Sequence, residues 1–302
     1  MNSYAIIGSG ALGGLYGAML SAAGHDVHFL LHRDYQHVGQ HGLTVESIWG
    51  DVHLPSPNVY DNADAMPPCD VTILATKTTL SDIAGELLAP PTRGGGVVLV
   101  LQNGLNIESP AIGVVGRERV YSGCCFLCSN KVGPGHIKHI DQGRIVFGRI
   151  DGPADSVATT IADEFCSAKI PTKTTDDVAM VRWRKLMWNI PFNGLSVVLD
   201  ASTEELITNP AATDLATRII HEVHRGAASA GVEIPEKQIE STLESTRTMV
   251  PYDSSMRLDF LAGRKLEIEA IYDNPVAAAK VDMPSVAMLR DQLRFLDRAN
   301  RS

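Results

Sequence analysis

The 302-residue sequence lacks several features that would place it in whole classes of protein. No apolar run approaches the roughly 20 residues that a membrane-spanning helix needs, so no membrane association is predicted. Acidic residues outnumber basic ones by 35 to 26, and the formal charge of −9 argues against nucleic acid as the main partner. The five cysteines are an odd number in a long chain, which is typical of reduced thiols in a cytoplasmic protein.

Two further absences argue against a secreted protein and against a metal site. The N-terminus has neither a basic nor an apolar segment of the secretory kind, so we expect no signal peptide and a cytoplasmic location. Cys125 and Cys128 have no second Cys or His pair at zinc spacing, so we predict no metal site. The segment His221-Glu222-Val223-His224 does not match the zinc-protease pattern, and we interpret it as a solvated helix face.

Strands and helices alternate in the first half of the chain. Short apolar runs predict buried strands at residues 4–7, 26–31, 71–75 and 97–101, and a helix at 81–88. Further strands are predicted at 120–126, 137–140 and 145–147, turns at 133–135 and 142–143, and a hairpin from 44–46 and 52–54. The alternation is typical of an α/β domain with a doubly wound, Rossmann-like sheet, which we place at residues 1–174.

The pattern changes after about residue 173. From there the chain has the periodicity of long amphipathic helices, interrupted by Pro and Gly. We therefore predict a second, all-helical C-terminal domain at residues 175–302.

The motif Gly8-Ser9-Gly10-Ala11-Leu12-Gly13 follows the first strand and opens a helix. In this context the first glycine permits a tight turn, the second lets a pyrophosphate approach the backbone, and the third packs helix against strand. The N–H groups of the helix N-terminus then face the phosphates. The motif predicts a dinucleotide site to which all six residues contribute.

The residues that follow three other strands are predicted to lie at the same dinucleotide site. The second strand ends in Leu31-His32-Arg33, where an arginine can pair with the 2′-phosphate of NADP(H) and no acid is present for the ribose of NAD(H). Asp34 follows at once, and a one-residue shift of register would restore an acid. Lys77 and Asn103 each follow a strand, at the edge where open α/β sheets bind ligands.

A polar stripe crosses an otherwise apolar helix in the second half. Its members, Lys185, Asn189 and Asn193, are spaced four apart and lie on one helical face. A half-buried lysine and two asparagines cost free energy unless a polar group meets them, so the stripe predicts a site for a small polar ligand. Pro191 lies between the asparagines and is expected to kink the helix.

In chain order, these motifs resemble the ketopantoate reductase (2-dehydropantoate 2-reductase) family over nearly the whole chain. The resemblance rests on the glycine motif, Lys77, Gln102-Asn103-Gly104, Trp183-Arg184-Lys185-Leu186, Asn189, Asn193, Ser255 and Glu267. It implies an NADP(H)-dependent oxidoreductase that reduces the 2-keto group of ketopantoate to give pantoate, on the route to pantothenate.

The resemblance also implies a role for each residue. Lys185 would be the catalytic proton donor, with Glu267 beside it at the reacting centre. The small 2-keto acid would be held by Asn103, Asn189, Asn193 and Ser255. The cofactor would be contacted by the glycine motif, Lys77, Asn103, Ser129 and Glu267, with Arg33 at the 2′-phosphate.

Two departures limit the choice of substrate. Thr203 stands where the family usually has an asparagine, and Tyr272-Asp273-Asn274-Pro275 stands where it commonly has Asn-Gly. Two alternatives therefore stay open: an NADP-dependent reductase of a different 2-keto or β-hydroxy acid on the same fold, and a non-catalytic dinucleotide-binding sensor. The apolar C-terminal helices are also compatible with a homodimer.

Overall fold

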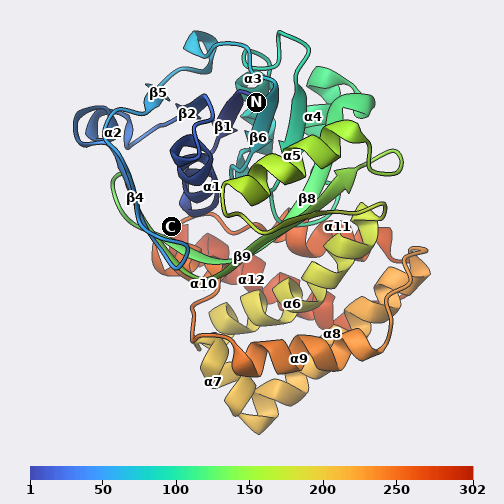
Figure 1. Ribbon diagram of the computed structural model, residues 1–302. Helices are drawn as coiled ribbons and strands as arrows, with labels where there is room; N and C mark the ends of the chain where they lie inside the picture. Colours follow the sequence, from blue (N-terminus) through green and yellow to red (C-terminus); the bar gives the residue numbers. More distant parts are fainter. Residues whose placement is uncertain (302) are drawn as a thin grey trace. The chain divides into compact units, whose positions relative to one another are not determined.

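The computed structural model describes residues 1–301. The chain forms two compact units. Unit 1 comprises Met1–Gln102 and Ile107–Val178, and unit 2 comprises Asn103–Asn106 and Ala179–Ser302 (Figure 1). The short loop that follows the strand ending at Val100 therefore belongs to the second unit rather than the first.

Unit 1 is built on a ten-stranded sheet of order β4-β3-β9-β8-β7-β6-β1-β2-β5, with β10 paired to β9. The strands are β1 (Tyr4–Ile7), β2 (Val27–Leu30), β3 (Leu43–Ser47), β4 (Val52–Leu54), β5 (Asn58–Tyr60), β6 (Val71–Leu74), β7 (Val97–Val100), β8 (Val120–Gly133), β9 (His136–Arg149) and β10 (Thr172–Thr174). Neighbours run parallel except in the hairpins β3–β4 and β8–β9. The predicted doubly wound, Rossmann-like sheet is confirmed.

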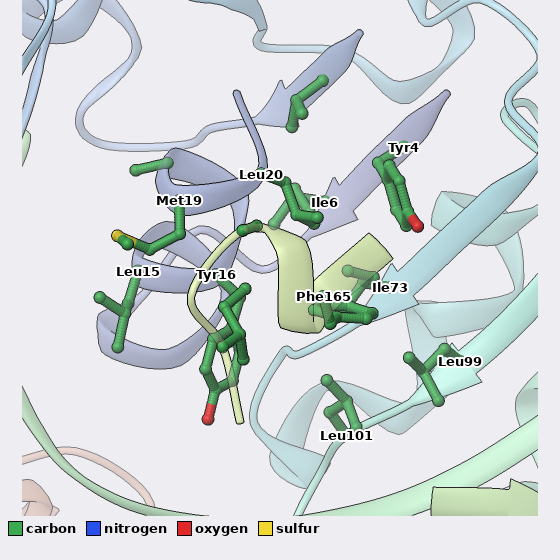
Figure 2. Close-up of a cluster of buried hydrophobic side chains, with 14 of the residues drawn as sticks. Tyr4, Ile6, Leu15, Tyr16, Met19, Leu20, Ile73, Leu99, Leu101 and Phe165 are labelled. Atoms are coloured by element: carbon green, nitrogen blue, oxygen red, sulfur yellow. The ribbon is translucent and has the colours of Figure 1, made fainter. Parts of the chain in front are cut away.

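The helices of unit 1 are α1 (Ala11–Ala22), α2 (Tyr35–His41), α3 (Ser81–Leu88), α4 (Ser109–Val115) and α5 (Ser156–Ser167). Strand residues alternate between the two faces of the sheet. Ile6, Ile73 and Leu99 turn to the same face and pack with Tyr16 of α1 and Phe165 of α5 (Figure 2). This closely packed apolar layer supports the strand ends that carry the predicted cofactor residues.

The hairpin β8–β9 differs from the prediction. Residues 137–140 and 145–147 were expected as separate strands around a turn at 142–143, but they form one continuous strand. Phe126 pairs with Arg144 and Leu127 pairs with Gln142, so Gly143 is an extra residue in a β-bulge. Gln142 and Gly143 have positive φ angles, which explains why the pair has the composition of a turn. The short strands β5 and β10 were not predicted.

All described elements of unit 2 are helical, as predicted. They are α6 (Val178–Val198), α7 (Thr203–Thr208), α8 (Pro210–Ser229), α9 (Lys237–Thr248), α10 (Ser255–Leu261), the π-helix η4 (Glu269–Asp273), α11 (Asn274–Ala278) and α12 (Pro284–Arg301). The apolar side of α6, including Trp183, Met187 and Ile190, lies in one buried cluster with residues of α8 and α12. None of the described helices is long and apolar enough to cross a lipid bilayer.

The interpretation of His221-Glu222-Val223-His224 as a solvated face was wrong. Glu222 is 3% exposed, and its carboxylate accepts hydrogen bonds from the N–H groups of Ser285 (3.2 Å) and Val286 (2.8 Å). It therefore caps the N-terminus of α12, where N–H groups lack helical partners. The segment is a tertiary anchor rather than a metal site, and residues 1–301 contain no cluster of His, Cys, Asp or Glu that could hold a metal ion.

Candidate active site

The three glycines of the N-terminal motif are required for three different geometric reasons. Gly8 has a φ of +103°, and a Cβ there would lie 2.4 Å from the backbone nitrogen of Thr76. A Cβ on Gly13 would lie 2.3 Å from the carbonyl oxygen of Gly8, so the helix approaches the turn closely. A Cβ on Gly10 would meet no atom of the protein within 4 Å. The space beside Gly10 is thus open for a ligand to approach the backbone.

Two hydroxyl groups join this turn to neighbouring strands. Ser9 Oγ donates to the carbonyl of Leu30 at the end of β2 (3.1 Å), and Ser129 Oγ on β8 donates to the carbonyl of Ala11 (3.2 Å). Ser129 therefore lies at the first turn of α1, next to the glycine motif, which is where a cofactor-contacting residue is expected.

The ends of β6 and β7 lie beside the same turn. In the parallel register Ile7 pairs with Leu74, and Leu74 pairs with Val100, so the carboxyl ends of three strands share one edge. Lys77 follows β6 at this edge. Gln102 Nε2 donates to both the carbonyl (2.9 Å) and the hydroxyl (3.0 Å) of Thr76. From the sequence, Gln102 was expected only as part of the Gln102-Asn103-Gly104 motif and had no assigned role; its amide holds the ends of β6 and β7 together.

Asp34 is not available as the acid that NAD(H) would require. Its carboxylate is buried, accepts the N–H of Gly135 (2.9 Å) and forms an ion pair with Lys131 of the β8–β9 hairpin. Arg33, one residue earlier, is exposed beyond the end of β2. The exposed charge next to this strand end is therefore basic.

In unit 2, the polar stripe lies along α6 as predicted. Lys185 is half-buried, Asn189 is 3% exposed and Asn193 is 1% exposed. The side-chain oxygen of Asn193 is buried without a hydrogen-bond partner among residues 1–301. An unpaired buried acceptor costs free energy, so this oxygen is suited to accept a hydrogen bond from a hydroxyl group.

The loop that carries Asn103 is attached at the Lys185 end of the stripe. Arg182, one helical turn before Lys185, donates to the carbonyl of Gly104 (3.0 Å). Asn274 Nδ2 donates to the carbonyl of Leu105 (2.7 Å). Asn274 belongs to the segment that departs from the family pattern, so this departure contributes an anchor for the loop.

The same loop is joined to the π-helix that follows Glu267. The N–H of Leu105 donates to the carbonyl of Ala270 (2.9 Å), one turn beyond Glu267, whose side chain is buried. Tyr272 donates to the carbonyl of Ile190 on α6 (3.0 Å). Burial raises the pKa of Tyr272 far above its usual range, so the hydroxyl remains a donor. Glu267 is thus held near the middle of the stripe.

Ser255 lies at the opposite end of the stripe. Ser196 Oγ donates to the carbonyl of Asn193 (2.9 Å) and lies 2.7 Å from Ser254 Oγ, the residue that caps α10. Thr203 is buried, and its hydroxyl donates to the carbonyl of Tyr252 (2.5 Å). In unit 2, Lys185, Asn189 and Asn193 lie on α6, and the segments that carry Asn103, Ser255 and Glu267 are each joined to α6 by hydrogen bonds of neighbouring residues.

Both halves of the chain match models of one protein family. Residues 4–152 match the family model described as "Ketopantoate reductase PanE/ApbA", and residues 177–297 match "Ketopantoate reductase PanE/ApbA C terminal". The chain belongs to the ketopantoate reductase family. It is therefore an oxidoreductase, and the predicted resemblance is confirmed.

Individual relatives extend the similarity to the full chain. A 2-dehydropantoate 2-reductase of Nostoc sp. is 45% identical, over 99% of this chain and 96% of its own length. The crystal structure of 2-dehydropantoate 2-reductase from Geobacter metallireducens has a TM-score of 0.94 at 38% identity, covering 97% of this chain and 99% of its own. D-mandelate dehydrogenase with NADH and anilino(oxo)acetate has a TM-score of 0.92 at 23% identity, covering 99% of this chain and 100% of its own, which shows the shared fold alone.

Proposed function

We propose that this protein uses NADPH to reduce the 2-keto group of ketopantoate (2-dehydropantoate) to the hydroxyl group of pantoate, in pantothenate biosynthesis. The observation that carries the proposal is the assembly around α6 of an ammonium group, two buried carboxamides, a buried carboxylate and a serine hydroxyl. The name of the Nostoc relative, which matches the full chain, supports the same substrate. In this proposal residues 1–174 bind the dinucleotide, and residues 175–302, together with Asn103, supply the substrate and proton-transfer groups.

The polar groups of unit 2 suit the reduction of a ketone. Bound NADPH supplies the hydride that forms the new C–H bond at the keto carbon. As this bond forms, the Lys185 ammonium donates a hydrogen bond and then a proton to the keto oxygen, which becomes the hydroxyl group. Glu267 orients the ammonium group. The carboxamides of Asn189 and Asn193 bind hydroxyl and carboxylate groups without adding charge, and Ser255 supplies a further donor.

The glycine turn fits a dinucleotide. The open space beside Gly10 and the N–H groups at the start of α1 suit a pyrophosphate. The close packing at Gly8 and Gly13 keeps the turn itself in place. The burial and pairing of Asp34 support NADPH over NADH, because the carboxylate neither binds a ribose 2′-hydroxyl nor repels a 2′-phosphate. Arg33 is the residue that pairs with that phosphate.

The cofactor preference has a direct test. Arg33→Ala removes a charge-assisted contact, so we expect kcat/KM for NADPH to fall by about ten- to a hundredfold, with kcat/KM for NADH unchanged. Arg93→Ala is the matched control, because Arg93 is an exposed arginine in the same unit whose guanidinium pairs with the exposed Asp64. An equal loss for both nucleotides would refute the assignment of Arg33.

The substrate is tested by following NADPH oxidation with a panel of 2-keto acids. We expect ketopantoate to give the highest kcat/KM. Negligible turnover of ketopantoate with rapid turnover of another 2-keto acid, or with rapid reduction of NADP⁺ by a β-hydroxy acid, would favour the first alternative. The structure gives a reason to include that alternative, because the Thr203 hydroxyl is already bonded to Tyr252 and offers no carboxamide to a substrate. NADPH binding with no turnover at all would indicate a sensor.

A further inference from the structure

The side chain of Gln102 continues the pairing of two strands beyond their backbone bonds. At the end of β7, the N–H of Leu101 donates to the carbonyl of Leu74 (2.9 Å). Gln102 comes next and is 4% exposed, and its amide nitrogen donates to the carbonyl (2.9 Å) and the hydroxyl (3.0 Å) of Thr76. An amide NH₂ group has two hydrogens, and these two bonds use both. Because a buried amide costs free energy unless it is paired, the pairing ties Thr76 firmly to Gln102.

These bonds also fix the direction of the peptide group that joins Thr76 to Lys77. There is no cis peptide bond among the described residues, and in a trans peptide the carbonyl and the N–H point in opposite directions. Since the Thr76 carbonyl is turned toward Gln102, the N–H of Lys77 points away from Gln102. The Gln102 amide therefore sets the orientation of the backbone from which Lys77 extends.

The same backbone forms one wall of the glycine turn. A Cβ on Gly8 would lie 2.4 Å from the nitrogen of Thr76 and 2.6 Å from the carbonyl carbon of Ala75. The N–H of Ala75 donates to the carbonyl of Ile7, the residue before Gly8 (2.8 Å). The two segments are in direct contact, so a displacement of Thr76 is transmitted to the turn.

We propose that Gln102 is a positioning residue for the dinucleotide cofactor. It acts through Thr76, which it holds so that the glycine turn and Lys77 keep the arrangement that binds the nucleotide. This inference rests on the proposed dinucleotide site. It gives a function to the first residue of the Gln102-Asn103-Gly104 motif, which belongs to unit 1 while the other two belong to unit 2.

Gln102→Met tests this role, because methionine has nearly the length and volume of glutamine but donates no hydrogen bond. We expect the dissociation constants of NADPH and NADH, and KM for NADPH, to rise about tenfold. At saturating NADPH, kcat should stay within about threefold of the wild-type value, because the proton donor Lys185 belongs to unit 2. Fluorescence titration and steady-state kinetics measure these quantities.

Thr92→Val is the matched control for a purely structural loss. Thr92 is buried in the same unit, and its hydroxyl donates to the carbonyl of Leu88 (2.8 Å). The preceding carbonyl, of Pro91, accepts the N–H of Cys69 just before β6 begins, so Thr92 lies at the opposite edge of the sheet. We expect Thr92→Val to lower the melting temperature by about 2–4 °C, as Gln102→Met does, but to leave both dissociation constants unchanged.

A double-mutant cycle tests whether Thr76 transmits the effect. Thr76→Val removes the hydroxyl acceptor and should raise both dissociation constants about threefold, whereas Thr76→Ser keeps the hydroxyl and should bind as the wild type does. In the Gln102→Met background, Thr76→Val should cause no further loss. Additive effects would overturn the proposal. Unchanged affinity in folded Gln102→Met, or an equal loss of affinity in Thr92→Val, would also overturn it.

These results are separate from the test of ketopantoate reduction, because the titrations contain no keto acid. A protein that binds NADPH but does not reduce ketopantoate refutes the proposed substrate, and the titrations still decide the role of Gln102. A preference for NADH refutes only the role of Arg33. A wild-type protein that binds neither nucleotide overturns both proposals.

Discussion

Lys185→Met is expected to lower kcat for NADPH-dependent keto-acid reduction by about 10²–10⁴-fold, the usual contribution of a positioned proton donor. Methionine keeps most of the apolar stem that packs along α6 but removes the ammonium group. Because Lys185 lies on the substrate stripe in unit 2, the dissociation constant for NADPH and the melting temperature should change little. Steady-state kinetics, fluorescence titration with NADPH and thermal melting measure the three quantities.

Lys265→Met is the matched control for this experiment. Lys265 is exposed and lies two residues before Glu267. Its substitution removes a positive charge close to Glu267 in sequence and leaves the polar stripe on α6 intact. We expect its kcat to remain at the wild-type value. Full turnover by Lys185→Met would refute the role of Lys185, and a loss of NADPH binding in that variant would instead place the residue in the cofactor site.

Gly8→Ala is expected to lower stability, whereas Gly10→Ala is expected to leave stability nearly unchanged and to weaken NADPH binding. At Gly8 a methyl group collides with the backbone of Thr76 at a positive φ, so the free energy of unfolding should fall by at least about 2 kcal/mol. At Gly10 the methyl group meets nothing in the protein, so stability should change by less than about 1 kcal/mol. The new methyl group would nevertheless occupy the space required by the pyrophosphate.

NADPH binding is therefore the measurement that reveals the effect of Gly10→Ala. Gly10→Ala should raise the dissociation constant for NADPH by about 5- to 150-fold, which corresponds to about 1–3 kcal/mol of steric cost. Gly113→Ala is the control, because Gly113 on α4 also has open space at its Cβ position. Denaturant unfolding and NADPH titration measure both effects. Unchanged NADPH affinity in a folded Gly10→Ala protein would show that the pyrophosphate lies elsewhere.

Short-range patterns predicted the elements that depend on neighbouring residues. The apolar run at residues 4–7 and the glycines that follow require only local geometry, because strand patterns and turn chemistry extend over a few positions. The stripe on α6 was equally predictable, since residues four apart share a helical face wherever the helix lies. The bulge at Gln142 and Gly143 was mistaken for a turn because both features use positive φ angles.

Contacts between residues far apart in sequence could not be predicted from local sequence patterns. Asp34 appeared to be a possible ribose ligand until the fold placed Lys131 and Gly135, about a hundred positions away in sequence, against its carboxylate. Glu222 had the sequence context of a solvated charge, but it caps a helix that begins more than sixty residues later. In both cases the polar environment comes from a distant element, and local periodicity contains no information about it.

By itself, the sequence determined the fold class, the dinucleotide-type turn and the identity of the groups on the α6 stripe. Each depends on residue type and near-neighbour spacing, which the chain carries explicitly. Only the tertiary structure decided that the segments carrying Asn103 and Ser255 bond to residues of α6, and that the Asn193 oxygen has no hydrogen-bond partner among residues 1–301. These outcomes depend on which polar groups find hydrogen-bond partners once distant segments pack against one another. Only the folded chain determines those partners.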